Sequence, residues 1–175
     1  MLVKTLIAVA VVVLGLVAFV ATRPGEFQVA RTATFAAPAP AVFAQVNELR
    51  KWEAWSPWAK KDPQMKQVYE GAPAGTGAVT SWQGNKDVGE GRMTIVESRP
   101  AERIRIKLEF FKPFAATNSG EFSFKEEGGR TAVTWSMRGQ NNFIGKAMCL
   151  LFDMDKMVGG DFEAGLASMK TIVEK

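Results

Sequence analysis

The last 34 residues, 142–175, constrain the fold more than any other stretch of the chain. Large apolar side chains recur there at steps of three and four, with charged side chains on the opposite face, which is the pattern of an amphipathic helix. The apolar stripe consists of Ile144, Met148, Leu151, Met154, Val158, Phe162, Leu166, Met169 and Val173. No other sequence after residue 25 has a comparable helical pattern, so the intervening residues must supply the surface that covers this stripe.

The stripe is too long to lie on a sheet as one helix. It would measure about 51 Å at about 1.5 Å per residue, whereas strands of eight or nine residues span about 30 Å. We therefore expect a short helix over Asn142–Leu151 and a long one that begins near Asp153 or Asp155, either of which could cap it. Gly159 and Gly160 fall inside the long helix. Because glycine has no side chain, these positions indicate that a strand packs closely against the helix there. The alternative is that they leave room for a ligand.

Residues 27–140 have the pattern of short strands and tight turns. In the clearest strand, four apolar residues alternate with charged ones. Strands are expected at Phe27–Phe35, Gln67–Glu70, Ala78–Gln83, Gly91–Ser98, Arg103–Phe111, Ala116–Lys125 and Thr131–Gly139, with one early helix at Ala41–Leu49. Even spacing of the turns predicts an antiparallel meander, and so an α+β domain in which six or seven strands curve around the C-terminal helix.

Residues 1–22 form a separate apolar segment. Lys4 precedes seventeen uncharged residues, Thr5–Ala21, and a membrane-spanning helix needs roughly 17 or more. A cleaved signal peptide is the alternative, but the candidate cleavage sites carry bulky residues where small ones are needed. We expect an uncleaved single-pass anchor, with Lys4 on the cytoplasmic side and the domain outside the cytoplasm. Residues 23–26 then link the anchor to one domain at 27–175.

Composition removes several classes of chemistry. The chain has no histidine and a single cysteine, Cys149. Intrachain disulfides, histidine-based nucleophile pairs and the usual zinc sites are therefore excluded, and we expect no metal and no cofactor. The basic residues are scattered, in runs no longer than a pair such as Lys60-Lys61, so nucleic acid is not an expected partner. No pair of carboxylates stands out as acid and base, so no catalytic residue is predicted.

Several local patterns occur in one order along the chain. They include Trp52-x-x-Trp55-Ser56-Pro57-Trp58, Tyr69-Glu70-Gly71, Ser81-Trp82-x-Gly84-Asn85, Thr131-x-Val133-Thr134-Trp135-x-Met137 and Asp161-Phe162-Glu163-x-Gly165-Leu166. Together they resemble the START-like (SRPBCC) superfamily, and within it the bacterial polyketide cyclase/dehydrase and lipid-transport branch. The resemblance covers about residues 27–175. It implies the helix-grip fold, in which a curved antiparallel sheet wraps around the C-terminal helix and leaves a cavity between them.

Such a cavity would be lined by the apolar face of the strands, by the helix and by aromatic residues at its mouth. The expected ligand-binding residues are Trp55, Trp58, Trp82, Ile106, Leu108, Phe110, Phe114, Phe122, Trp135, Met154, Met157 and Val158. Each of them could instead be ordinary core. The three tryptophans between residues 52 and 58 either line the mouth or anchor a short helix to the sheet.

Three functions follow from these patterns. The expected one is a membrane-anchored, non-enzymatic domain that binds a small hydrophobic ligand, such as a lipid, an isoprenoid or an aromatic metabolite. The second is a cyclase or dehydratase, which the resemblance suggests and which needs an acid or base inside the cavity. The third is a module whose mouth loops bind another protein, for which the sequence names no partner.

Overall fold

A computed structural model of the chain describes residues 1–151 and 153–175, and all of their side chains except that of Leu151. The helices are α1 (Leu2–Ala21), α2 (Ala39–Asn47), the 3-10 helix η1 (Leu49–Lys51), α3 (Trp52–Trp55), α4 (Pro57–Lys61), α5 (Phe143–Leu151) and α6 (Met154–Val173). The strands are β1 (Glu26–Phe35), β2 (Lys66–Gly71), β3 (Ala78–Gln83), β4 (Glu90–Arg99), β5 (Arg103–Lys112), β6 (Ala116–Glu127) and β7 (Arg130–Gln140).

The strands form one antiparallel sheet in the order β1-β7-β6-β5-β4-β3-β2. The predicted meander is confirmed, and β1 closes it against β7. A tight turn fixes the register of β6 and β7, because Gly128 and Gly129 both have positive φ, 60° and 73°, between the paired residues Glu127 and Arg130. Two consecutive positive φ angles are what a two-residue type I′ hairpin requires, and glycine adopts them without strain.

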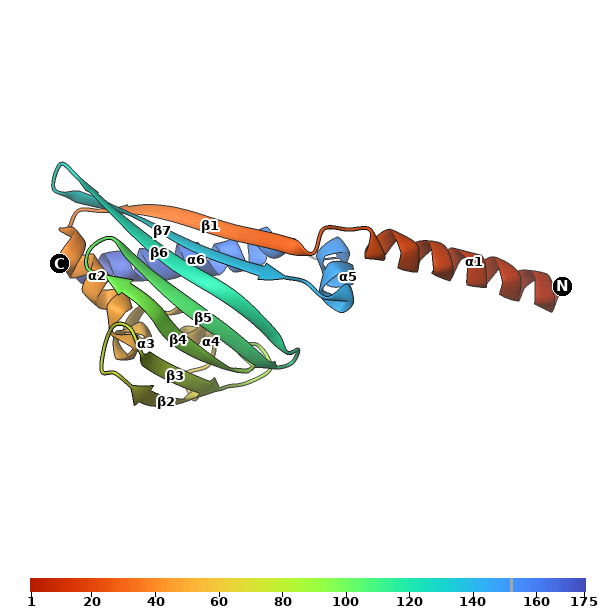
Figure 1. The fold of residues 1–175 in the computed structure, drawn as a ribbon, viewed down its shortest axis with the longest axis horizontal. Helices are drawn as coiled ribbons and strands as arrows, with labels where there is room; N and C mark the ends of the chain where they lie inside the picture. The colour runs from red at the N-terminus through yellow and green to blue at the C-terminus, as the bar shows by residue number, and fades with distance from the viewer. Residues whose placement is uncertain (152) are drawn as a thin grey trace.

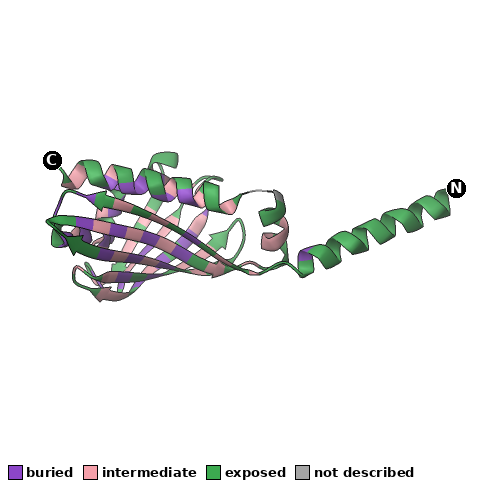
Figure 2. Ribbon diagram, turned by 90° about the horizontal axis from the view of Figure 1, so that it is seen from above, coloured by how far each residue is buried: buried purple, intermediate pink, exposed green. Residues whose placement is uncertain are grey.

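Helix α6 lies across the concave face of the sheet, as Figure 1 shows. Its large buried residues are Phe162, Leu166 and Met169, and Figure 2 shows that the buried side of this helix faces the strands. The expected division into two helices is confirmed. Asp153 is the cap of α6, since its Oδ1 accepts a hydrogen bond from the backbone N–H of Lys156 at 3.1 Å. The predicted contribution of Leu151 to the stripe lies outside the described side chains.

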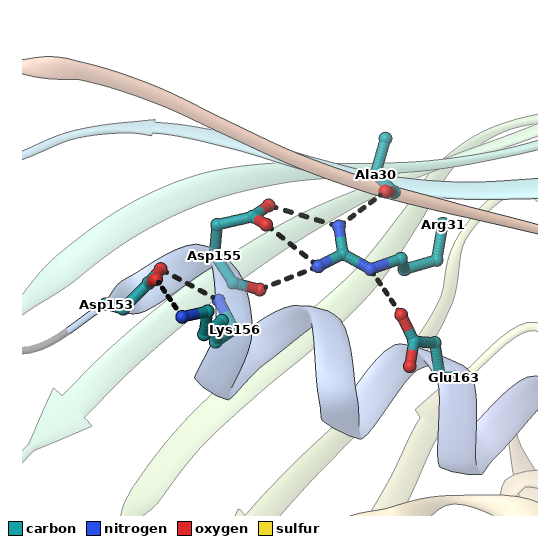
Figure 3. A network of polar contacts seen from close by, with 6 residues as sticks. All are labelled: Ala30, Arg31, Asp153, Asp155, Lys156 and Glu163. Atoms are coloured by element: carbon teal, nitrogen blue, oxygen red, sulfur yellow. Dashed lines mark hydrogen bonds and ion pairs between the residues drawn. The ribbon is translucent and has the colours of Figure 1, made fainter.

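Asp155, the other candidate cap, instead binds Arg31 of β1 (Figure 3). Arg31 Nη2 lies 2.8 Å from Asp155 Oδ2, and its Nε lies 2.6 Å from Glu163 Oε1. These two hydrogen bonds raise the pKa of Arg31, the one to Asp155 most, and the guanidinium in turn lowers the pKa of Asp155. The guanidinium occupies the space where a side chain on Gly159 would be, whereas Gly160 has no neighbour within 4 Å. Close packing against a strand therefore explains Gly159.

The aromatic core lies where the short helices meet α6 and the sheet. Trp52 and Trp55 are 7% and 0% exposed, and their indole N–H groups donate to the carbonyls of Val46 and Gln45 at 2.9 and 3.1 Å. Because a buried indole needs such a partner, each ring is fixed in orientation as well as depth. These two tryptophans therefore anchor the short helices to the sheet.

Candidate ligand-binding site

A cavity of about 530 Å³ lies between the sheet, α4, α5 and α6. Binding sites for small molecules are typically about 300–1,000 Å³ and mostly apolar. Three inward-facing rows of side chains cross the sheet, and all of their members except Gly91 and Ile95 line the cavity. The row nearest the α5 end contains Trp82, Gly91, Phe110 and Ala116; the second contains Thr80, Met93, Leu108 and Asn118; the third contains Ile95, Ile106, Gly120 and Met137.

Small residues in these rows decide where the empty volume is. Gly91 leaves none, because the ring of Trp82 lies directly over it. Gly120 does leave space, since a Cβ atom added there would meet Leu108 Cδ1 at 3.5 Å and Ile106 Cβ at 3.6 Å, both ordinary van der Waals distances. The cavity therefore reaches into the sheet at Gly120, with apolar side chains on either side.

Nine of the twelve expected site residues line this cavity. They are Trp58, Trp82, Ile106, Leu108, Phe110, Phe114, Trp135, Met154 and Val158. Trp55 and Phe122 are fully buried in the aromatic core behind it, and Met157 is 57% exposed. Met157 and the buried Phe162 are five residues apart in α6. At about 100° per residue, Met157 therefore lies about 140° around the helix from Phe162, away from the sheet. The expectation that these three residues line the cavity is therefore wrong.

Other lining residues were not predicted. Thr80 and Met93 lie at inward positions of the predicted strands, so alternation alone could have found them. Ile144, Met148 and Asn141 line the cavity because α5 folds over one end of it. No periodic pattern could have placed them there, since the position of α5 depends on the turn after β7.

Charge is scarce around the cavity. Asp161 is the one acidic residue in the described lining, and its Oδ1 lies 2.7 Å from Lys61 Nζ; the described lining contains no lysine or arginine. Outside the described lining, the hydroxyl of Tyr69 donates a hydrogen bond to Glu53 Oε1 at 2.6 Å and lies 2.9 Å from Gln67 Oε1. Burial, and then the hydrogen bond to Glu53, raise the pKa of Tyr69. No group of acidic and cysteine side chains suited to a metal ion occurs within the described part of the chain.

The cavity reaches the surface beside α5. Phe114, Ile144 and Met148 line it and are nevertheless 58%, 53% and 39% exposed. We call these three residues the mouth residues. The same end of the domain meets α1, because Lys146 Nζ of α5 donates to the carbonyl of Ala21 at 3.2 Å. Helix α1 is long and apolar enough to cross a membrane, although a signal sequence would also meet that criterion. It projects away from the domain at the α5 end (Figures 1 and 2).

Solved structures of similar fold support this architecture. The di-domain ARO/CYC protein BexL from the BE-7585A biosynthetic pathway superposes with a TM-score of 0.63 at 18% identity, over 89% of this chain and 52% of that one. Protein CV1439 from Chromobacterium violaceum gives 0.59 at 14%, over 85% and 97%. The Aha1 dimer from Colwellia psychrerythraea gives 0.60 at 10%, over 85% and 96%. At these identities the likeness concerns the fold.

Comparison by sequence is more specific. No curated protein matches the chain significantly. The family model described as polyketide cyclase / dehydrase and lipid transport, however, matches residues 26–174, which is nearly the whole chain beyond α1. The resemblance seen in the sequence motifs is thereby confirmed, and the chain belongs to the polyketide cyclase/dehydrase and lipid transport family.

Proposed function

We propose that residues 27–175 bind a small hydrophobic molecule in the cavity and release it unchanged. The cavity carries this proposal, because its volume of about 530 Å³ suits a small molecule and its described lining is mostly aliphatic and aromatic. A solid core would bury the same residues around no such space. The family to which the chain belongs includes lipid transport in its description, which supports the same conclusion.

A cyclase or dehydratase reaction has less support. Such chemistry needs an acid or base held near the substrate with a pKa suited to proton transfer. The acidic residue of the described lining, Asp161, is held by Lys61 in an ion pair of 2.7 Å that joins α4 to α6. Its carboxylate is thus part of the contact between these helices, and binding accounts for the cavity without a reaction.

Filling the cavity should weaken binding while the fold is preserved. We expect Gly120→Leu to weaken binding of the neutral fluorophore 1-aminoanthracene at least about tenfold, because the new side chain would occupy the space the probe needs. The strand should tolerate it, since glycine is a weak strand residue and a Cβ atom there makes only ordinary contacts. Binding is measured by energy transfer from the cavity tryptophans to 1-aminoanthracene. The full chain is kept in solution by an amphipathic polymer whose chains are too large to enter the cavity.

Ser119→Leu is the matched control, since it adds the same side chain to the exposed, outer face of the same strand. It should bind 1-aminoanthracene as the unmodified chain does. Equal binding by Gly120→Leu and the unmodified chain would reject the proposed function.

We further propose that α1 remains as a membrane anchor, with the domain outside the cytoplasm, and that the mouth residues lie at the bilayer surface. Lys4 favours that orientation. The contact between Lys146 and Ala21 supports the arrangement, because it holds α5 beside the end of α1. Exposed apolar side chains at the mouth would then rest among the lipids, where burying them is favourable.

Polar substitutions at the mouth should slow exchange with lipid. We expect Phe114→Ser combined with Ile144→Ser to reduce several-fold the rate at which 1-aminoanthracene passes from phosphatidylcholine vesicles to the vesicle-anchored full chain. Stopped-flow energy transfer measures that rate. Replacing Phe111, which is 53% exposed and does not line the cavity among the described residues, with Ser is the control. An unchanged rate in the double variant would contradict a lipid-facing mouth.

A further inference from the structure

One residue of the cavity wall carries a polar atom that has no partner within the described part of the chain. The hydroxyl of Thr80 is buried, with the residue 3% exposed, and no group in the described part of the chain hydrogen-bonds to it. Thr80 lines the cavity from the second row, beside Met93. Its other cross-strand neighbour is Tyr69, whose hydroxyl is already engaged 2.6 Å from Glu53. The strand ladder therefore supplies nothing to this hydroxyl.

A buried hydroxyl without a hydrogen bond costs free energy, so such a group inside a binding cavity indicates what the ligand should offer. The hydroxyl oxygen has almost no accessible surface as it stands, and rotation about the Cα–Cβ bond of Thr80 would turn it toward the cavity, where a water molecule could satisfy it in the free protein. A ligand without a polar atom would displace that water and leave the hydroxyl unpaired, whereas a ligand with an oxygen at this point would replace the lost bond. The cavity should therefore discriminate between molecules of equal size by one oxygen atom.

The charge of that oxygen-bearing group is also constrained. A buried carboxylate or phosphate needs a cationic partner, and the described lining offers neither lysine nor arginine. Asp161 would add repulsion, because it is the acidic residue of the same lining. A hydroxyl or a carbonyl meets the requirement, because a threonine hydroxyl both donates and accepts hydrogen bonds.

We propose that the ligand is an uncharged amphiphile, a hydrophobic alcohol or ketone, whose single oxygen hydrogen-bonds to Thr80 Oγ1 while its apolar body fills the cavity toward Gly120. This inference rests on the proposed binding function and names its ligand class. The oxygen lies inside, one row deeper than Trp82 and Phe110. The ligand thus enters through the mouth with its oxygen leading or turned inward, and no charged group remains buried.

The test compares Thr80→Val and Thr80→Ser in the full chain, held in the same amphipathic polymer. Undecane, 1-decanol and decanoate each compete with 1-aminoanthracene. Undecane and 1-decanol differ by a methyl group in place of the hydroxyl. For each competitor, the apparent dissociation constant from the variant is divided by that from the unmodified chain, so that partition of the competitor into the polymer cancels. Thermal unfolding of each variant is recorded without competitor.

We expect Thr80→Val to weaken the binding of 1-decanol about two- to tenfold, as the loss of one hydrogen bond would. The binding of undecane should be unchanged or tighter. Thr80→Ser should restore the preference for the alcohol. The melting temperature of Thr80→Val should be unchanged or higher, because an unpaired hydroxyl is removed. A structural role for Thr80 predicts the opposite, a lower melting temperature with the preference intact.

Equal changes for undecane and 1-decanol in Thr80→Val would overturn the inference while the proposed binding function stands. A loss of decanoate binding in Thr80→Val as large as the loss of 1-decanol binding would overturn the assignment of an uncharged ligand. If no competitor displaces the fluorophore and Gly120→Leu binds it normally, the binding function itself fails, and this inference fails with it.

Discussion

Replacing Trp135 with alanine is expected to lower the free energy of unfolding by about 3–5 kcal/mol, the usual cost of removing a large buried aromatic side chain. Trp135 is 4% exposed. Its ring stacks on Phe162 of α6 with centroids 4.1 Å apart, and on Phe122 of β6 with centroids 4.8 Å apart. Removing it would separate the helix from the sheet at the point where both contribute most aromatic surface.

The loss of stability in Trp135→Ala should exceed that of an ordinary core substitution, because further aromatic rings pack on Trp135. Trp135 also meets the rings of Trp52, Trp55 and Trp58 edge to face, at 5.9, 5.7 and 5.7 Å between centroids. Each such pair contributes about 0.5–1.5 kcal/mol beyond buried area. The short helices α3 and α4 would therefore lose contacts with the sheet together with α6.

Urea unfolding of the full chain, followed by near-ultraviolet circular dichroism, measures this change. Phe111→Ala is the control, because it removes an aromatic ring that is 53% exposed on the same sheet, and surface substitutions of this kind usually change stability by less than about 0.5 kcal/mol. A loss below about 1 kcal/mol in Trp135→Ala would contradict the aromatic attachment of α6.

Local periodicity in the sequence was sufficient to predict most of the fold. Alternation in Arg103–Phe111 and its neighbours indicated which faces are buried, and the predicted strand bounds lie within about two residues of those observed, the usual uncertainty of element ends. The division of the C-terminal stripe followed from a comparison of helix and strand lengths, which needs no tertiary information. Family resemblance then supplied the cavity, which periodicity by itself does not predict.

Tertiary contacts account for what the sequence did not settle. Trp55 lies in the core away from the cavity, whereas Trp52 and Trp58 line it, because the three short helical segments turn the rings by amounts that no simple period describes. Arg31 stands at an inward position of its strand, yet its partners Asp155 and Glu163 lie more than 120 residues away in sequence. That the Thr80 hydroxyl has no partner among the described residues is likewise a matter of tertiary contacts, which alternation does not predict.

Two glycines of α6 should respond oppositely to the same substitution. We expect Gly165→Leu to destabilise the protein by about 1–3 kcal/mol, the usual cost of overpacking. A Cβ atom at Gly165 would lie 2.9 Å from Trp135 Cζ3 and 3.1 Å from Pro57 Cδ. Gly160→Leu should stabilise it by up to about 1 kcal/mol, because glycine is a poor helix former and nothing lies within 4 Å of that position.

This pair tests whether the cavity depends on how closely α6 approaches the sheet. A Cβ atom added at Gly165 would lie 2.9 Å from the Trp135 ring, so a leucine there must lift the helix or displace this ring, which forms part of the cavity wall. Binding of 1-aminoanthracene should therefore fall in Gly165→Leu and stay unchanged in Gly160→Leu, as energy transfer from the tryptophans would report. If both variants bind alike and unfold at the same urea concentration, the helix tolerates a wider separation, and the small residue at 165 does not set the size of the site.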